Sequence, residues 1–208
     1  MKTHALPSAV LALTLLAASP AVFADDKPAK AGDKKAAAQL SEEEMTKKWM
    51  EAATPGAPHK VLDAFVGDWT VASKWWMDPT APPMESKGTA SKKWILDGRF
   101  LQEDFSGEMM GMPFTGTGLT GYDNLKKQYN NSWVDSSSTA IFTSLGAASK
   151  DGKTLTFNSK MDDCMTGEKD KPVRFVLKIE SKDKHSFEMY EGAGSKEKKA
   201  GEMTYTRK

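Results

Sequence analysis

Residues 153–161, KTLTFNSKM, decide the fold class of this chain, because apolar and polar side chains alternate along them. Leu155, Phe157 and Met161 share one side of this segment, and residues 173–179, VRFVLKI, repeat the pattern. Successive residues of a β-strand point to opposite faces, so each segment has one dry face and one wet face. A period of two therefore predicts half-buried β-strands.

Turn signals recur about every ten residues from Gly67 onward, which is typical of a β sandwich or barrel. Asp97-Gly98 and Asp151-Gly152 are hairpin dipeptides, because both central residues of a type I′ turn need positive φ. Counting the segments gives about ten strands between Trp69 and Arg207. Antiparallel strands with one solvated face close on themselves or stack. The sequence therefore predicts an all-β protein, a closed antiparallel barrel, with a two-sheet sandwich as the alternative.

Local composition predicts the nature of the segments that precede the barrel. Lys2, an apolar run and small residues ahead of Asp25 form the pattern of a cleaved signal peptide, so we expect a periplasmic or secreted protein that begins at Asp25. Ser41 and Glu44 have the spacing of a capping box at the start of a short helix. The expected organisation is a signal peptide (1–24), a flexible leader (25–40), an N-terminal helical segment (41–66) and a β-barrel domain (67–208).

Charge and composition exclude several classes of partner. Removing residues 1–24 takes away one base, Lys2, and leaves 28 basic residues against 28 acidic ones. Such a balance gives no electrostatic footprint for nucleic acid or an anionic membrane. After the signal peptide, no apolar stretch reaches the roughly 20 residues that span a bilayer. Cys164 is the only cysteine, and we expect an unpaired surface thiol, with pairing to another chain as the alternative.

The two ends of the expected barrel carry a recognisable pair of residues. Gly67-Asp68-Trp69 opens the first strand, and Arg207 ends the last one. In a closed barrel these strands are neighbours, so Arg207 can lie across the Trp69 ring and gain about 1 kcal/mol of cation–π energy. The pair resembles the Gly-x-Trp and the late arginine of the calycin superfamily, which includes lipocalins and fatty-acid-binding proteins. Gly67, Trp69 and Arg207 would then have a structural role, closing one end of the barrel.

Six further stretches point to one family: PHKVL (58–62), WMDP (76–79), PPMESKG (82–88), GRFLQE (98–103), GLTGYD (118–123) and TYTRK (204–208). They are similar to a bacterial secreted family known as domain of unknown function fifteen-seventy-nine. The resemblance covers the chain from about Met45 to Lys208 and implies a lipocalin-like fold. It implies no catalytic or binding residues.

Several polar residues share a strand face with apolar ones. Arg99 and Glu103 alternate in step with Leu101, and Asn131 and Asp135 in step with Trp133. Buried charges and amides need partners, so this set forms an internal network or contacts a ligand in a cavity. The expected ligand-binding residues are Trp75, Trp94, Arg99, Glu103, Asn131, Trp133 and Asp135.

These residues predict an exported barrel that binds a small apolar or aromatic molecule. The alternative is a structural or protein-interaction module with a filled barrel. A lesser alternative is Cu(I) binding by Met109, Met110 and Met112, because soft sulfur ligands select Cu(I), although methionine is also a flexible filler of apolar rims.

Other chemistry finds little support in the sequence. His185 could ligate a haem iron, but a single histidine is more often an ordinary polar residue. No cofactor is predicted. The chain has no Gly-x-Ser-x-Gly, no glycine-rich phosphate loop after a strand and no His-Glu-x-x-His, so we do not expect an enzyme.

Overall fold

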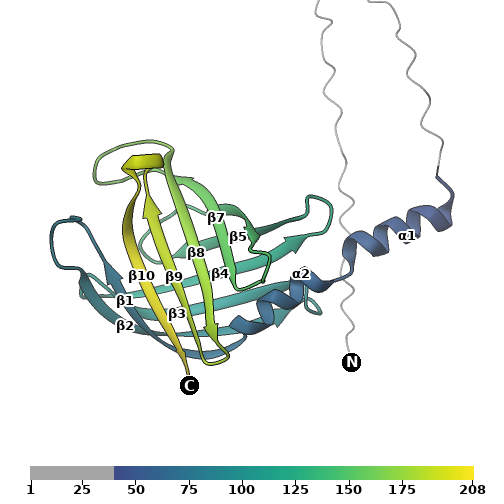
Figure 1. The fold of residues 1–208 in the computed structure, drawn as a ribbon, viewed down its shortest axis with the longest axis horizontal. Helices are drawn as coiled ribbons and strands as arrows, with labels where there is room; N and C mark the ends of the chain where they lie inside the picture. The colour runs from purple at the N-terminus through teal and green to yellow at the C-terminus, as the bar shows by residue number, and fades with distance from the viewer. Residues whose placement is uncertain (1–39) are drawn as a thin grey trace, which may run out of the picture. The chain divides into compact units, whose positions relative to one another are not determined.

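The computed structural model describes residues 40–208, so the predicted signal peptide and the leader up to residue 39 lie outside the described residues. Ten antiparallel strands form a closed barrel in the order β1-β10-β9-β8-β7-β6-β5-β4-β3-β2 (Figure 1). The predicted barrel is confirmed and the sandwich alternative is wrong. The strands are β1 (Gly67–Trp75), β2 (Met84–Ile95), β3 (Phe100–Met109), β4 (Met112–Asp123), β5 (Gln128–Asp135), β6 (Phe142–Ala148), β7 (Thr154–Met161), β8 (Lys171–Ser181), β9 (Lys184–Glu191) and β10 (Lys198–Arg207).

The barrel closes where β1 pairs with β10, with Trp69 opposite Arg207. The Arg207 guanidinium lies 4.2 Å from the centre of the Trp69 ring. It also donates hydrogen bonds to the carbonyl oxygens of Val66 at 2.7 Å and Lys182 at 2.8 Å. At Gly67, where φ is +128°, a Cβ would lie 2.3 Å from Arg207 Nη1. The seam therefore requires glycine at this position.

Three short helical elements precede the barrel: α1 (Glu42–Ala53), α2 (Ala57–Lys60) and the 3-10 helix η1 (Val61–Phe65). The Ser41 and Glu44 side chains cap α1 reciprocally. Leu62 and Phe65 of η1 are fully buried and pack with Leu101 of β3. Burying two large apolar side chains stabilises this end of the barrel by roughly 3–6 kcal/mol. We call it the plugged end.

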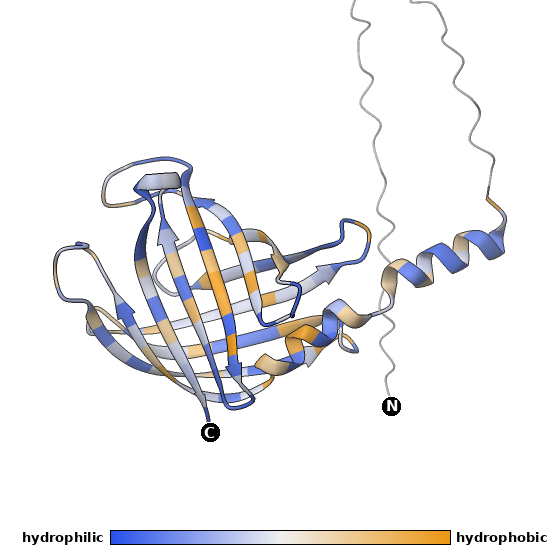
Figure 2. Ribbon diagram, viewed as in Figure 1, coloured by the Kyte–Doolittle hydropathy of each residue, from blue (hydrophilic) through white to orange (hydrophobic). Residues whose placement is uncertain are grey.

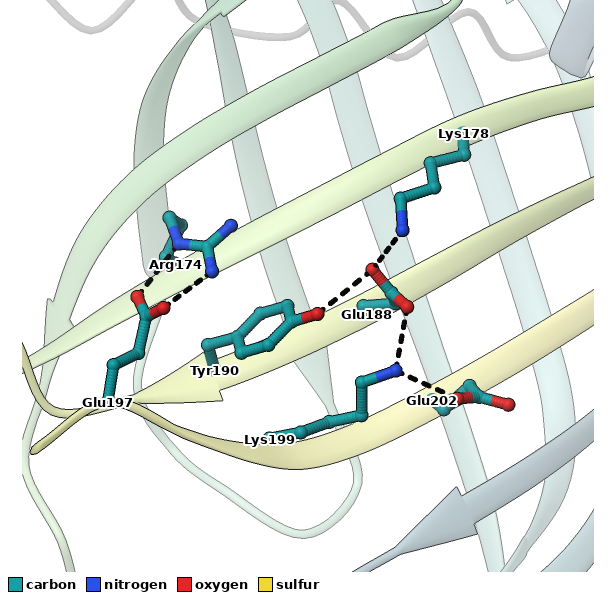
Figure 3. A network of polar contacts seen from close by, with 7 residues as sticks. All are labelled: Arg174, Lys178, Glu188, Tyr190, Glu197, Lys199 and Glu202. Atoms are coloured by element: carbon teal, nitrogen blue, oxygen red, sulfur yellow. Dashed lines mark hydrogen bonds and ion pairs between the residues drawn. The ribbon is translucent and has the colours of Figure 1, made fainter. Parts of the chain in front are cut away.

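The strands have one apolar and one polar face, as Figure 2 shows by the alternation of orange and blue along them. On the outer face of β8, β9 and β10, charged side chains form a network of polar contacts in which Arg174 and Glu197 are a separate pair (Figure 3). Glu188 accepts hydrogen bonds from Lys178 at 2.6 Å and Lys199 at 2.7 Å. Arg174 binds Glu197 through two nitrogens, at 2.8 and 2.6 Å. This network crosslinks three neighbouring strands without using the interior.

The hairpin turns differ from the two-residue type I′ geometry that their dipeptides predict. At the first hairpin Leu96, Asp97 and Gly98 all have positive φ, and the turn spans residues 96–99, so β3 starts at Phe100. At the second hairpin only Gly152 has positive φ, and five residues separate β6 from β7. In this longer loop Gly152 lies close to Val61 of η1, at the plugged end.

Two smaller observations concern the surface of the described region. Cys164 is exposed and has no disulfide partner. Within residues 40–208, no helix combines the length and the apolar character that crossing a membrane would need.

Candidate functional site

Four polar or aromatic side chains meet on the inner face of the barrel. Lys92 of β2 lies directly opposite Glu103 of β3, and His185 of β9 lies opposite Tyr205 of β10. The Lys92 Nζ atom is 3.1 Å from Glu103 Oε2 and 3.2 Å from His185 Nε2. We call these four residues the inner polar cluster. It exists because closure of the barrel brings β2 and β3 near β9 and β10.

The lysine of this cluster is fully engaged. Lys92 has only 4% of its side chain exposed, and burial lowers its pKa while Glu103 opposes that change. An ammonium group has three protons. One points to Glu103, one to His185, and the Nζ atom lies 4.1 Å from the centre of the Tyr205 ring, within cation–π range. Lys92 therefore has no proton left for a ligand.

The histidine of the cluster is neutral. Burial lowers the pKa of His185 to about 2, with further lowering from Lys92 and Arg207. The imidazole stacks on the Tyr205 ring at 4.3 Å and meets the Trp69 ring edge-on. Since Nε2 accepts from Lys92, Nδ1 carries the proton, and that atom has no hydrogen-bond partner anywhere in residues 40–208. His185 thus lies buried between the Tyr205 and Trp69 rings, and its Nε2 atom accepts a hydrogen bond from Lys92.

Glu103 is the member of the cluster that solvent reaches, with 21% of its side chain exposed. Its Oε1 accepts a hydrogen bond from the Tyr205 hydroxyl at 3.2 Å, and its Oε2 pairs with Lys92. Burial strongly raises the pKa of Tyr205, so the hydroxyl stays protonated and donates. A carboxylate has about four lone-pair sites, so Glu103 keeps acceptor capacity toward the interior.

The inner wall of the barrel also carries aromatic rings that are only half-buried. Phe175 and Phe187 stack with ring centres 5.6 Å apart, and each packs against a different core cluster. Trp133 lies over the backbone of Gly116 and Gly118, where a Cβ would collide with its ring. These inward-facing rings remain partly exposed.

A pocket of about 400 Å³ opens at the end of the barrel opposite the plugged end. Its lining includes Trp75, Met84 and Met109, together with Met77 and Met110 from the adjoining turns. We call it the mouth pocket. The volume exceeds the roughly 300 Å³ that marks the lower end of small-molecule sites.

The residues predicted to bind a ligand are distributed over both ends of the barrel. Trp75 reaches the mouth pocket, whereas the Trp94 indole donates a 2.8 Å hydrogen bond to Asp63 at the plugged end. Arg99 lies in the turn before β3, where it donates to the Leu96 carbonyl. Of these residues, only Glu103 belongs to the inner polar cluster.

The remaining predicted polar residues bond within their own sheet. Asn131 donates to the Thr120 hydroxyl at 2.9 Å. Asp135 accepts from the Trp133 indole at 2.9 Å and from Ser137 in the following loop. The weakly predicted methionines also separate: Met109 and Met110 line the mouth pocket, while Met112 is exposed on the other strand of the hairpin.

Sequence reasoning misses three residues of the inner polar cluster, and of these Tyr205 is indicated only as an inward-facing ring of the last strand. Lys92 alternates in step with Ala90 and Trp94, which signals an inward position, but a lysine beside Lys93 is most simply read as solvent-exposed. The sequence presents His185 as a haem ligand or an ordinary polar residue. Nothing near it in the sequence indicates its contact with a lysine 93 positions away.

The comparisons with known proteins agree with the barrel. The structure of Rv2717c from M. tuberculosis is similar, with 14% identity, a TM-score of 0.53 and coverage of 74% of this chain and 99% of that chain. An S-type phycobiliprotein lyase, CPES from Guillardia theta, is also similar, with 11% identity, a TM-score of 0.52 and coverage of 77% and 96%. Likeness at this identity shows the fold alone.

No curated protein matches the chain. A family model does match residues 54–207, and the chain therefore belongs to the family described as protein of unknown function DUF1579.

Proposed function

We propose that the barrel binds a small, largely apolar molecule whose polar end donates a hydrogen bond to Glu103. One observation carries the proposal: a partly exposed carboxylate with spare acceptor capacity faces an interior lined by half-buried aromatic rings. Small-molecule sites typically combine an apolar wall with a few placed polar groups. On this proposal the protein acts after export, as a chain that begins at Asp25.

The polar contacts of the cluster decide which end groups fit. The protons of Lys92 and Tyr205 are already directed at Glu103, His185 or an aromatic face. The free capacity is therefore acceptor capacity, which suits a hydroxyl, an amine or a ring N–H. A ligand carboxylate would face the Glu103 carboxylate, and the one donor of the cluster without a partner, the His185 Nδ1–H, is buried between aromatic rings where a ligand does not reach it. The site should thus discriminate against fatty acids in favour of the corresponding alcohols.

The apolar body of the ligand would lie along the inner wall. Phe175, Phe187 and Trp133 present ring surface there, and Met203 beside them offers a flexible side chain. Covering about 100 Å² of this apolar surface contributes roughly 2.5 kcal/mol before the costs of association. A ligand with an aromatic or long aliphatic body therefore fits better than a fully polar one.

A pair of ligands with equal chain length tests the proposal without altering the protein. Decan-1-ol and decanoate are titrated into the mature chain while tryptophan emission is followed. We expect saturable binding of the alcohol and at least about 10-fold weaker binding of the acid at pH 7, because the acid brings a like charge to Glu103. Equal affinities, or no response to either ligand, would remove the proposal.

A variant then assigns the contact to Glu103. Glu103→Gln converts a charge-assisted hydrogen bond into a neutral one, and we expect about 5-fold weaker binding of decan-1-ol. The same change removes the charge repulsion and should improve binding of decanoate. Glu85→Gln at the exposed rim is the matched control, since its side chain is 70% exposed and it should change neither affinity. Circular dichroism of each variant confirms that the barrel is intact.

A further inference from the structure

The mouth pocket forms where two strands of the barrel separate. The pairing of β2 with β3 ends at Gly88 and Gly107. Beyond that point β2 continues beside β1 as far as Met84, and β3 continues beside β4 as far as Met109. The two strand ends thus diverge, and the pocket of about 400 Å³ lies between them.

Side chains from several segments converge on this pocket. Trp75 at the end of β1 is the cross-strand partner of Met84 in β2, so their side chains lie next to each other. Met77 comes from the loop after β1, and Met109 and Met110 come from the end of β3 and its turn. The pocket therefore collects four thioethers and one indole ring from segments that are distant in the sequence.

Packing accounts for Met109, which lies against the core, but it does not account for the other three methionines of the pocket. Met77 and Met110 are 63% and 61% exposed, and Met84 is also exposed. A side chain left in water contributes little burial energy, and three exposed apolar side chains around one open pocket carry a solvation cost. Their common property is a soft, polarisable sulfur atom. Thioether sulfur selects Cu(I) among the biological metal ions.

The surroundings of the sulfur atoms suit a monovalent cation. The face of an indole ring attracts a cation within about 6 Å. Trp75 is part of the pocket lining, and Glu85 and Glu108 in the same lining provide negative charge. Thioethers are neutral, so binding needs no deprotonation and should depend little on pH above the range in which carboxylates titrate.

We propose that the mouth pocket binds one Cu(I) ion through the thioethers of Met77, Met84, Met109 and Met110, with the Trp75 indole against the ion. This site lies at the mouth, six residues along β3 from Glu103, or roughly 20 Å at the rise of an extended strand. It is separate from the proposed ligand site. Either proposal can fail while the other stands.

The test is an anaerobic titration of the mature chain with Cu(I) against a chromogenic Cu(I) chelator. The protein carries Cys164→Ser, because the exposed thiol would itself bind Cu(I). We expect one equivalent of Cu(I) to be retained, accompanied by quenching of tryptophan emission. Ag(I), which has the same charge and softness, should reproduce the quenching, whereas Zn²⁺ should not.

Three variants assign the site. Met84→Leu with Met109→Leu keeps side-chain volume but removes two sulfur atoms, and we expect affinity to fall by at least about 100-fold. Met112→Leu, in the same hairpin but outside the lining, is the matched control and should bind as the parent does. Trp75→Phe should retain most of the binding and lose most of the quenching. No retained Cu(I), or an equal loss in the Met112 and Met84/Met109 variants, would overturn the proposal.

Discussion

The buried pair of Lys92 and Glu103 allows the interior of the barrel to be tested through stability. Glu103→Gln removes the counter-charge of the Lys92 ammonium group, whose side chain is only 4% exposed. Removing one partner of a buried ion pair typically lowers the free energy of unfolding by about 3–5 kcal/mol. Because Glu103 is 21% exposed, solvent already screens part of the interaction, and we expect about 3 kcal/mol. Lys92→Met also costs about 3 kcal/mol, since it unpairs both Glu103 and the Nε2 atom of His185.

The double variant separates this argument from a general intolerance of mutation. With both charges gone, the remaining cost is the unpaired His185 nitrogen and imperfect packing, about 2 kcal/mol. The double variant should therefore be more stable than either single variant. The double-mutant cycle should give a coupling free energy of roughly 4 kcal/mol between Lys92 and Glu103. Urea unfolding followed by tryptophan emission measures all four proteins. For a domain of this size each kcal/mol also corresponds to about 2–4 °C in Tm.

The pH dependence provides an independent check. In Glu103→Gln, burial holds the pKa of Lys92 below that of the unfolded chain, so the unfolded state binds more protons and stability rises with pH. The deficit should be fully present below the folded-state pKa of Lys92 and shrink as the pH rises from there toward 10.5, the ordinary value for lysine. Single and double variants whose costs simply add, or a deficit that is constant with pH, would refute the reasoning.

Three further predictions concern the scaffold. Burial alone would raise the pKa of Glu188, but hydrogen bonds and charge from two lysines overcome this and lower the pKa to about 2. The contribution of Glu188 to the free energy of unfolding is therefore present above pH 4.5 and is lost as the pH falls toward 2. Glu188→Gln should cost about 1–2 kcal/mol at pH 7 after allowing for solvent screening and almost nothing at pH 2, as urea titrations at both pH values would show. Arg207→Lys removes the forked hydrogen bonds and the stacking on Trp69, so calorimetry should find the free energy of unfolding lower by about 2 kcal/mol. An unchanged Tm would mean that the seam does not need the arginine. Phe65→Ala should cost about 3–5 kcal/mol in the same assay because the ring is fully buried, and a cost below about 1 kcal/mol would show that the plugged end is not part of the cooperative core.

The barrel is predictable because its determinants are local. Alternation along residues 153–161 needs no knowledge of distant partners, and the same period recurs strand after strand. Closure by itself makes the first and last strands neighbours, and this is enough to place Arg207 against Trp69. The exact turns are less predictable, because the helices at the plugged end influence the loops around them.

The candidate sites are predictable only in part, because they depend on contacts between distant segments. The parity of Glu103 with Leu101 indicates its inward position, but its partner Lys92 carries a residue type that is mostly exposed to water. Asp135 and Trp133 are two apart on one strand face, so their hydrogen bond is a local contact that alternation alone can indicate. Nothing in the sequence joins Met84 to Met109, since only the divergence of β2 and β3 places both in one pocket.

The seam between β1 and β10 also has a kinetic consequence. Thr70 and Thr206, which are bonded across it, lie 136 residues apart in the chain, and contacts of such high sequence separation form slowly. Until Lys198–Arg207 has paired, the edges of β1 and β9 have no partner and can recruit strands from other chains. The last ten or so residues thus complete the barrel by covering both open edges, and a translation product that stops short of them should be prone to aggregation.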